Sequence, residues 1–395
     1  MFANPEFKVN PYPAYRRLRE NAPIHWTDSF GGAWLLPRYA DVVKAMRDPR
    51  LSARRSYLLV DRLPREDRKE LAQLNRIVGN WISFLDPPEH SRLRKPLETV
   101  FTPAALKTMR PCIEKIADSL LDKMQEKGEM EFMHDFAYPF PSLVLANVLG
   151  IPTKDLDRFI AWSDDFVSFQ APKPTLEVAT RAQNSLIAIT EYFKALLAER
   201  HQEQHNIFCL LKDFEDEEGE LPLEAILAQF TMLIIVGQET TRYFLGNAVL
   251  ALLQHPQQWE ILKRDPSLAP NAVQELLRYE SSVQSSIRLI TEEFVLHGRT
   301  LKPGQFVISL IGSANRDPAK FTNPEILDIT RSQPPHIAFG YGAHFCLGAA
   351  LAHMESEIAL NCLLNRMPNL KLASDTPDWN LEISLRGLNR LPVAC

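Results

Sequence analysis

The sequence predicts a mainly α-helical protein with a small β part, an α+β fold formed by a single domain over residues 1–395. Two observations lead to this prediction. Apolar residues recur with helical spacing along most of the chain, and the few strand-like segments are short and lie toward its two ends. The middle contains neither a serine- or glycine-rich linker nor an internal repeat, so one folded unit is the simplest account.

The helical pattern is found in ten segments, near residues 12–20, 39–47, 104–126, 139–149, 154–169, 176–203, 223–253, 257–263, 268–279 and 346–365. The strand-like segments are Ile24–Trp26, Ala33–Leu36, Phe294–Leu296 and Phe306–Leu310. Turn residues separate the last two, including His297-Gly298. We expect the early and late strands to share one small sheet, which ties the two ends of the chain together. The acidic run at 213–220 is expected to be a solvated loop.

Composition excludes several classes of protein. The chain has 395 residues, a net charge of −5 and a pI of about 6.1, so it lacks the basic surface that nucleic-acid binding requires. The sequence contains no apolar run near the roughly 18 residues of a membrane span, and its first 21 residues do not form a signal pattern. The cysteine count is odd, without metal-finger spacing, and the residues are Cys112, Cys209, Cys346, Cys362 and Cys395. Reduced thiols in the cytoplasm are expected.

One of these cysteines lies in an unusual loop. Residues 339–348 read Phe-Gly-Tyr-Gly-Ala-His-Phe-Cys-Leu-Gly, and they hold three of the chain's 15 glycines. Such an excess suggests a backbone pressed against a flat group. Leu351 and Ile358 belong to a helical stripe directly behind the loop, so Cys346 lies at or beside a helix N-terminus. That position favours a thiolate, which is a nucleophile or a metal ligand. The alternative is a buried structural cysteine in a tight turn.

The run Phe-Gly-x-Gly-x-His-x-Cys-x-Gly resembles the haem-ligand loop of the cytochrome P-450 superfamily, and every fixed position is filled. The chain looks like a soluble, bacterial-type member. The resemblance implies haem b with the Cys346 thiolate as axial iron ligand, and Phe339, Gly340 and Gly348 beside the haem. It also implies the single-domain P-450 fold, with the haem between the long central helix and the helix after the cysteine loop.

Cations that would bind the haem propionates are expected in three segments. Asp-Pro-Pro-Glu-His-Ser-Arg-Leu-Arg at 86–94 begins a helix at its prolines, and His90 and Arg94 stand four residues apart on one face. The resemblance places both on a propionate, together with Arg288 and His344. The alternatives are an ordinary solvated helix start for the first pair and a strand-edge cation for Arg288.

The long helix at 223–253 is interrupted at its centre by Val236-Gly237-Gln238-Glu239-Thr240-Thr241. Helix propensity disfavours these residues there, and an acid and an alcohol are costly to bury without partners. The segment resembles the family's oxygen-activation motif, in which Thr240 hydrogen-bonds dioxygen and Glu239 relays protons. Val236 stands where the family usually has alanine or glycine, so we expect a narrowed pocket on that side.

Glu275 and Arg278 form a Glu-x-x-Arg pair of a kind that is common on exposed helices. The pair also resembles one that is buried in the family and braces the cysteine loop, which implies a structural role. Ile326 stands where the family often has an arginine that completes this network. Arg331 and His336 are the two candidates to replace it.

The resemblance implies a haem-thiolate monooxygenase that inserts one oxygen atom from O₂ into a hydrophobic small molecule, by hydroxylation or epoxidation. The sequence has neither a Gly-x-Gly-x-x-Gly run nor cluster-type cysteine spacing, so a separate ferredoxin and its reductase are expected to supply electrons. Arg92 and Lys95 are candidates for docking an acidic ferredoxin, although His353 occupies a position that is often arginine. A membrane anchor and nucleic acid are not expected.

The resemblance also indicates which residues contact the substrate. These substrate-pocket candidates are Trp81, Ile82, Phe166, Leu233, Val236, Gly237, Val283 and Leu385, with Gln284 and Arg386 as polar contacts.

Three alternatives remain. A peroxide-driven peroxygenase generally replaces the acid–alcohol pair, which is intact here. A non-catalytic haem-thiolate sensor has no need of a proton relay. A cysteine hydrolase built on Cys346 lacks an accompanying oxyanion or acid motif.

Overall fold

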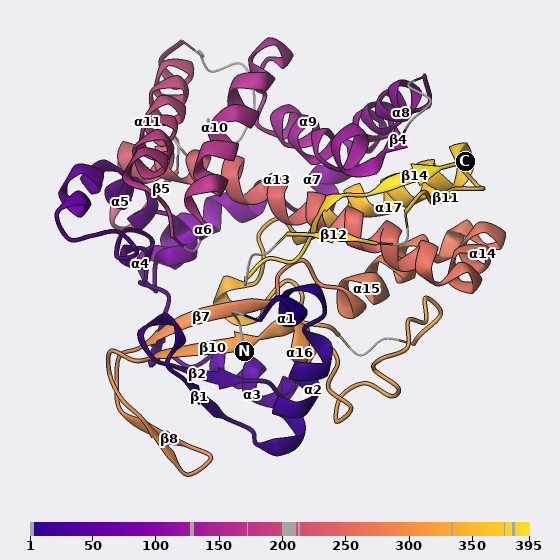
Figure 1. Cartoon of the computed structure of the whole chain (residues 1–395). Coiled ribbons are helices and arrows are strands. Elements are labelled where there is room, and N and C mark those ends of the chain that lie inside the picture. Colours follow the sequence, from indigo (N-terminus) through magenta and orange to yellow (C-terminus); the bar gives the residue numbers. More distant parts are fainter. Residues whose placement is uncertain are drawn as a thin grey trace. The chain divides into compact units, whose positions relative to one another are not determined.

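The structure, a computed structural model, describes residues 4–126, 130–171, 173–199, 211, 214–332, 335–374, 376–380 and 384–395. Its internal contacts form two compact units (Figure 1). The first comprises Met1–Leu51, Lys107–Pro141 and Thr240–Cys395, and the second Ser52–Leu106 and Ser142–Glu239. Each unit combines segments that are distant in the sequence, so neither is an independent stretch of chain. Cys209 lies outside the described residues.

A mixed five-stranded sheet anchors the first unit. Its order is β1 (His25–Thr27), β2 (Ala33–Leu36), β10 (Phe306–Leu310), β7 (Ser285–Ile290) and β3 (Leu51–Ser52). β10 runs parallel to β2, with Phe306 opposite Ala33, and antiparallel to β7, with Phe306 opposite Leu289. The expectation that early and late strands share a sheet is therefore confirmed for β2 and β10.

The expected strand Phe294–Leu296 forms but does not join this sheet. It is β8, and it pairs with β9 (Arg299–Leu301) in a separate hairpin. His297 and Gly298 have φ values of 49° and 73°, and this left-handed turn sends the chain straight back on itself. The prediction was wrong for β8 because turn geometry, rather than strand propensity, determines its partner.

The core of the first unit lies against this sheet. β10 is buried at every residue, and α3 (Tyr39–Ala45) packs against it. α16 (Ile311–Ala314) contacts α2 (Tyr12–Asn21) and α3. The buried apolar cluster consists of Ile24, Leu36, Val42, Ala45, Leu51, Ile290, Phe294, Leu301, Val307, Ile311, Ala314 and Ile337. Burial of these side chains fixes the start and end of the chain on the same sheet.

The other described elements of the first unit are helices and short strands. The helices are α1 (Pro5–Val9), α8 (Arg110–Glu126), α14 (Pro256–Arg264), α15 (Ala269–Tyr279) and α17 (Ala349–Arg366), with single turns at Ser29–Gly31, Met133–Ala137, Pro266–Leu268 and Gly342–His344. α17 packs against α8 and α15. β11 (Lys371–Leu372), β14 (Pro392–Ala394) and β4 (Met130–Glu131) form one small sheet, and β12 (Asp378–Trp379) pairs with β13 (Leu388–Arg390).

The second unit is helical apart from one small hairpin. Its helices are α4 (Tyr57–Val60), α5 (Ala72–Gly79), α6 (Glu89–Val100), α10 (Leu156–Phe169) and α11 (Leu176–Glu199), with single turns at Asp67–Leu71, Ile82–Phe84 and Thr153–Asp155. α10 and α11 pack together, and α5 packs against α11. Aromatic side chains join α10 to α11: the Phe159 ring meets that of Tyr192 edge-on at 4.9 Å between centroids. The hairpin, β5 (Glu215–Asp216) and β6 (Gly219–Glu220), replaces the loop expected at 213–220.

Three helices contribute residues to both units: α7 (Pro103–Lys107), α9 (Pro139–Val148) and α13 (Leu223–Gln254). α13 is long and apolar enough to cross a membrane by composition, but 67% of its most apolar window is buried inside the protein. That burial is typical of a core helix in a soluble protein.

Most of the expected helices form close to their predicted bounds. The exception is the segment 104–126, which breaks into α7 and α8. Pro111 lacks the N–H that a continuous helix would donate to residue 107, and its ring would clash there. The short helices α1, α4, α5 and α16 were not predicted, because four to eight residues carry too little periodicity to detect.

Candidate haem site

The cysteine loop folds back on itself before α17 begins. The Cys346 N–H donates to the Phe339 carbonyl oxygen at 2.9 Å, and the Phe345 N–H donates to Gly342 O at 3.0 Å. The rings of Phe339 and Phe345 lie edge to face, 6.3 Å apart. Cys346 is exposed, three residues before α17 starts at Ala349 with Gly348 at its N-cap. The prediction that Cys346 lies beside a helix N-terminus is confirmed.

Two glycines of this loop have a backbone reason for being glycine. Gly340 and Gly342 have φ values of 76° and 75°, which glycine adopts without strain. A Cβ on Gly342 would also lie 3.0 Å from the carbonyl oxygen of Met46. Arg47, the next residue, stacks on Tyr341 with its guanidinium 4.4 Å from the ring centre. Close approach to this neighbouring segment therefore explains Gly342 without invoking a flat ligand.

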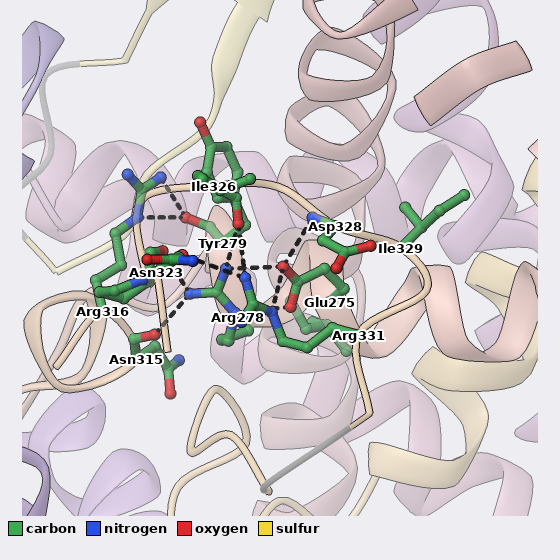
Figure 2. Close-up of polar contacts among 12 residues, drawn as sticks. Glu275, Arg278, Tyr279, Asn315, Arg316, Asn323, Ile326, Asp328, Ile329 and Arg331 are labelled. Carbon is green, nitrogen blue, oxygen red and sulfur yellow. Dashed lines mark hydrogen bonds and ion pairs between the residues drawn. The ribbon is translucent and has the colours of Figure 1, made fainter. Parts of the chain in front are cut away.

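A buried ion network is centred on Glu275 and Arg278 (Figure 2). Arg278 and Glu275 on α15 form a bidentate pair with N–O distances of 2.7 and 2.8 Å, and both side chains have no exposed surface. Arg331 Nε lies 3.1 Å from the same carboxylate. Arg331 is therefore the third member, and of Ile326 only the carbonyl oxygen takes part, accepting from both arginines. The Glu275–Arg278 pair is buried, as the resemblance implied.

Asn315 joins this network to the cysteine loop. Its carbonyl oxygen accepts from Arg278 Nη1 at 3.0 Å, and its Oδ1 accepts from the Ile337 N–H at 2.8 Å. Ile337 lies two residues before Phe339, whose carbonyl accepts from Cys346. Buried hydrogen bonds therefore link Glu275, through Arg278 and Asn315, to Ile337. The chain from Ile337 to Phe339 completes the connection to the backbone that holds Cys346. The sequence did not single out Asn315.

Two histidines beside the loop are held neutral. Burial lowers the pKa of His336 to about 3, helped by the nearby charges of His353 and Arg278. Burial also lowers the pKa of His353 to about 4. His336 Nδ1 accepts from the Ala338 N–H, and the His353 ring lies 5.1 Å from that of Phe339. His336 is thus a neighbour of the Glu275 network and not its third member.

The centre of α13 combines exposed and buried residues. Val236 is 44% exposed and Gly237 is also exposed, whereas Gln238 and Glu239 directly after them are buried. Gln238 is satisfied within the second unit, because its Nε2 donates to Ile234 O at 2.7 Å and its Oε1 accepts from Ser142. In the described structure, an apolar strip at the middle of an otherwise buried helix is therefore left uncovered.

Glu355 is a buried acid that contacts the oxygen-activation segment and that no sequence pattern indicated. Glu355 on α17 is 2% exposed. Burial raises its pKa well above the usual range, and a hydrogen bond with the Thr241 side chain opposes this only in part. Thr241 follows Thr240 directly on α13. The sequence gives no signal for this burial, because an acid on a helix is ordinarily exposed.

We expect Glu355→Gln to stabilise the protein more in alkaline than in mildly acidic buffer. The folded state retains a proton that the unfolded chain releases above its ordinary pKa, so this contribution to stability is complete below that pKa and is lost as the pH rises. Glutamine cannot ionise. Thermal unfolding of the variant and the wild type across this pH range should show a difference in Tm that grows by a few degrees with pH.

The matched control is Glu357→Gln, two residues away on the same helix. Its carboxylate is 26% exposed and pairs with Arg110 at 3.1 Å, so the variant's Tm difference should not grow in that direction. A constant Tm difference for Glu355→Gln would show that Glu355 is ionised in the folded protein.

The four expected propionate ligands divide between the units. His90, which is 1% exposed, and Arg94 lie on α6 in the second unit. Arg94 Nε also pairs with Glu98 at 2.6 Å, an i, i+4 contact with an exposed partner. Arg288 lies on β7 in the first unit, with Nη1 3.2 Å from Ser286 Oγ, and His344 lies in the turn before Cys346. Their roles toward a haem remain predictions.

The pocket candidates also form two groups. Trp81, Ile82, Phe166 and Leu233 are buried in the second unit. There, the Trp81 and Phe166 rings lie 5.2 Å apart, and Trp81 Nε1 donates to Thr231 Oγ1 at 2.8 Å. In the first unit, Val283 and Leu385 face each other in an isolated β-bridge.

The two polar pocket candidates, Gln284 and Arg386, form hydrogen bonds to other protein groups in the first unit. Gln284 Nε2 donates to Ser281 O at 2.7 Å, and Arg386 donates to Glu280 and to the carbonyls of Lys8 and Val9. The sequence could not predict these hydrogen bonds, because the partners lie up to 378 residues away along the chain.

A haem is a flat apolar ring with two carboxylates, and the residues described above fit such a group. In the first unit, Cys346 is exposed on its hydrogen-bonded loop, and in the second unit Val236 and Gly237 are exposed. Arginine and histidine side chains, as at Arg288 and His90, are of the type that binds carboxylates. A cysteine thiolate is an established iron ligand for haem.

Comparisons with known proteins agree with this fit. The cytochrome P450 family model matches residues 267–385. The biotin biosynthesis cytochrome P450 of Bacillus subtilis is 36% identical over 395 residues, covering 99% of this chain and 98% of that protein. The polyketide biosynthesis cytochrome P450 PksS of the same organism is also 36% identical, covering 98% and 96%.

Among solved structures, P450BioI in complex with an acyl carrier protein ligated to hexadec-9-enoic acid matches with a TM-score of 0.91 at 35% identity. That match covers all of both chains. CalO2 matches with a TM-score of 0.91 at 32% identity, covering 99% of this chain and 97% of that one. Identity above 30% over nearly the whole length, together with the cysteine loop, leads to one conclusion: the chain belongs to the cytochrome P450 family, as a haem enzyme with the thiolate of Cys346 as axial iron ligand.

Proposed function

We propose that this P450 is a monooxygenase that inserts one oxygen atom of O₂ into a hydrophobic small molecule. The other oxygen atom leaves as water, so each turnover consumes two electrons and two protons besides O₂ and substrate. One observation carries the proposal: an acid and an alcohol, Glu239 and Thr240, occupy the centre of the core helix α13, with Glu239 only 4% exposed. An acid beside an alcohol in the middle of an apolar core helix is disfavoured by helix propensity, which favours a role in proton delivery.

The bound haem supplies an electron-rich iron for O₂ activation, because the thiolate donates electron density to it. Residues of the chain then take up the protons and transfer them. Glu239 takes up a proton from solvent on a carboxylate oxygen and passes it, through water, to the Thr240 hydroxyl. Thr240 Oγ1 then gives its own hydrogen toward the dioxygen to which it is hydrogen-bonded, so each residue returns to its starting state. A side-chain hydrogen bond between Thr241 and Glu355 joins this turn of α13 to α17. His90, Arg94, Arg288 and His344 are proposed to bind the propionates.

The substrate is proposed to be an apolar chain or ring system, such as a fatty acid, a terpenoid or a polyketide. The candidate pocket residues are apolar or aromatic, as expected for a ligand site. The names of the relatives support a biosynthetic role, since one acts in biotin biosynthesis and another in polyketide biosynthesis. P450BioI was crystallised with a fatty-acyl carrier protein, and a carrier-bound acyl chain is therefore included among the substrates to test.

Electrons are proposed to come from a separate ferredoxin and its reductase in the cytoplasm. Of the two cations considered for docking, Arg92 is already engaged within the second unit. Its Nε lies 2.9 Å from Asp216 Oδ2, and its Nη2 donates to Gly219 O at 2.7 Å. Arg92 therefore anchors the β5–β6 hairpin, and the docking surface is expected to use other cations.

The test is reconstitution of the haem-loaded protein with a bacterial ferredoxin, ferredoxin reductase and NADH. Fatty acids, terpenoids and acyl carrier proteins are supplied as substrates under ¹⁸O₂. Substrate-dependent NADH oxidation with one ¹⁸O atom in the product would support the proposal. Oxygenation with peroxide alone, and none with NADH and ferredoxin, would indicate a peroxygenase. Substrate-induced spectral changes without any product would indicate a sensor.

We expect Thr240→Ala to uncouple electron transfer from oxygen insertion. The variant should retain haem and its reduced carbon-monoxide spectrum, but release several-fold more hydrogen peroxide per NADH, because the hydroxyl that guides the proton is missing. Peroxide and product are measured together in the reconstituted system. Thr240→Ser is the matched control, since it keeps the hydroxyl and should retain most of the coupling. Unchanged peroxide release in Thr240→Ala would remove Thr240 from the mechanism.

A further inference from the structure

The first unit contains a cavity of about 590 Å³, within the size range of small-molecule sites. Its wall combines α2, the last turns of α13, the chain after α15 and the segment that precedes β13. All residues of the wall belong to this one unit, and Cys346 is not among them.

The carboxylate of Glu280 in this wall is surrounded by donor and cationic groups. It accepts from the Tyr12 hydroxyl and from Arg386 Nε, both at 2.6 Å, and lies 3.8 Å from Arg316. The two arginines are 7% and 5% exposed. Arg386 stacks on Trp379 with its guanidinium 3.5 Å from the ring centre. Two arginines therefore already balance the charge of this carboxylate, which disfavours a ligand cation beside it.

The second carboxylate in the wall, Glu325, is occupied in the same way. Arg316 Nη1 lies 3.0 Å from it and Arg16 Nη2 3.2 Å. Arg17 is exposed, and no ion pair joins it to another described residue. Arg16, Arg17, Arg316 and Arg386 oppose only two glutamates in the lining, so the cavity is positively charged. Guanidinium groups bind carboxylates through paired, charge-assisted hydrogen bonds, which favours an anionic ligand.

Arg386 connects this cavity to the loop that carries Leu385. Its Nη1 and Nη2 donate to the carbonyls of Lys8 and Val9, each at 2.9 Å. Its own backbone N–H donates to Ser282 O at 2.7 Å, and its carbonyl accepts from Asn247 Nδ2 at 2.9 Å. The preceding residue, Leu385, forms the β-bridge with Val283. The side chain in the cavity wall is thus one residue away from a candidate substrate contact.

We propose that this cavity binds a small organic carboxylate and that its occupancy is coupled, through Arg386, to the loop that carries Leu385. The binding site stands on the cavity and its charge alone. The coupling rests on the proposed role of Leu385 and Val283 in the substrate pocket. An anion in the cavity adds a further contact to Arg386, whose guanidinium already bonds to Glu280, Lys8 and Val9. This contact favours one position of the backbone at Leu385, which orders that part of the substrate pocket before a ligand arrives.

Binding is tested by calorimetry on the haem-loaded protein with benzoate and with hexanoate. Benzamide, which has the same ring without the charge, is the control ligand. At least one carboxylate should bind at one site per chain, and benzamide should not. Arg17→Glu should weaken this binding about tenfold or more, whereas Arg299→Glu, an exposed arginine on β9 outside the cavity, should leave it unchanged. No binding of either carboxylate up to about 10 mM, or equal binding to Arg17→Glu, would overturn the proposal.

Coupling is tested with clotrimazole, whose azole nitrogen ligates haem iron and shifts the Soret band. Saturating benzoate should tighten clotrimazole binding about fivefold, and clotrimazole should tighten benzoate binding by the same factor. The effect should reach a plateau with benzoate concentration, whereas direct competition at the haem would weaken clotrimazole binding without limit. Arg386→Lys keeps the charge but loses the paired bonds to Lys8 and Val9, so it should bind benzoate without the coupling.

The outcomes separate this proposal from the proposed function. Arg17→Glu should lose benzoate binding while it keeps the clotrimazole shift and the reduced carbon-monoxide spectrum. A protein that binds benzoate but never oxygenates a substrate would refute the proposed function and leave the cavity site standing. Benzoate binding without any effect on clotrimazole affinity would overturn the coupling.

Discussion

We expect Cys346→Ser to abolish the characteristic Soret band of haem-thiolate proteins. In the reduced protein with carbon monoxide, this band lies at a longer wavelength than it does with histidine ligation. The thiolate is the axial ligand whose electron density sets that spectrum, and a serine hydroxyl is too weak an acid to replace it at neutral pH. The difference spectrum of the dithionite-reduced protein measures this directly. The rate of oxygenation of any substrate should fall by orders of magnitude, because the thiolate no longer donates the electron density that favours O–O cleavage.

Cys362→Ser is the matched control on the helix that follows the loop. Burial, with the nearby charges of Asp118 and Glu114, raises the pKa of the Cys362 thiol to about 11. A thiol of that kind does not supply a thiolate at neutral pH, so the variant should keep the full spectrum. A red-shifted band that survives in Cys346→Ser and disappears in Cys362→Ser would overturn the ligand assignment.

Glu275→Gln is expected to be the most destabilising single substitution in the ion network. It leaves the buried guanidinium groups of Arg278 and Arg331 without their carboxylate, and breaking a buried ion pair typically costs about 3–5 kcal/mol. Because Asn315 links Arg278 to the backbone at Ile337, the cysteine loop should loosen as well. Urea unfolding of the haem-loaded protein measures the loss, and the haem content after purification should fall with it.

Glu260→Gln is the control with the same spacing. Glu260 and Lys263 on α14 also stand three residues apart, at 2.7 Å, but their side chains are 47% and 27% exposed. Exposed pairs of this kind contribute about 0–1 kcal/mol, so this variant should unfold near the wild-type urea concentration. Equal losses in the two variants would mean that the Glu275 network does not brace the loop.

The sequence predicted the helices well because their apolar stripes are long. α13 was expected at 223–253 and spans Leu223–Gln254, and α10 was expected at 154–169 and spans Leu156–Phe169. Strand pairing was harder, because β8 has the same apolar character as a strand of the main sheet. Only the left-handed turn at His297 and Gly298 decides that it pairs with β9.

The parts of the candidate site that could be predicted are those formed by residues close together in the sequence. The cysteine loop and the Glu239-Thr240 pair are local patterns, so their positions followed from the sequence. The pairing of Glu275 with Arg278 is likewise local, but its burial is not. Exposed and buried i, i+3 pairs look the same in a sequence, and only packing showed that this one is inaccessible to water.

By itself, the sequence determined the α+β class, the bounds of the long helices, the cysteine loop and the acid–alcohol pair. These features arise from short-range periodicity and adjacent residues. Only the tertiary structure decided that Arg331 completes the network of Glu275, that Glu355 meets Thr241, and that Arg386 binds Glu280 and the first helix. Each of these contacts joins residues that are far apart along the chain, and their energies depend on burial that exists only after folding.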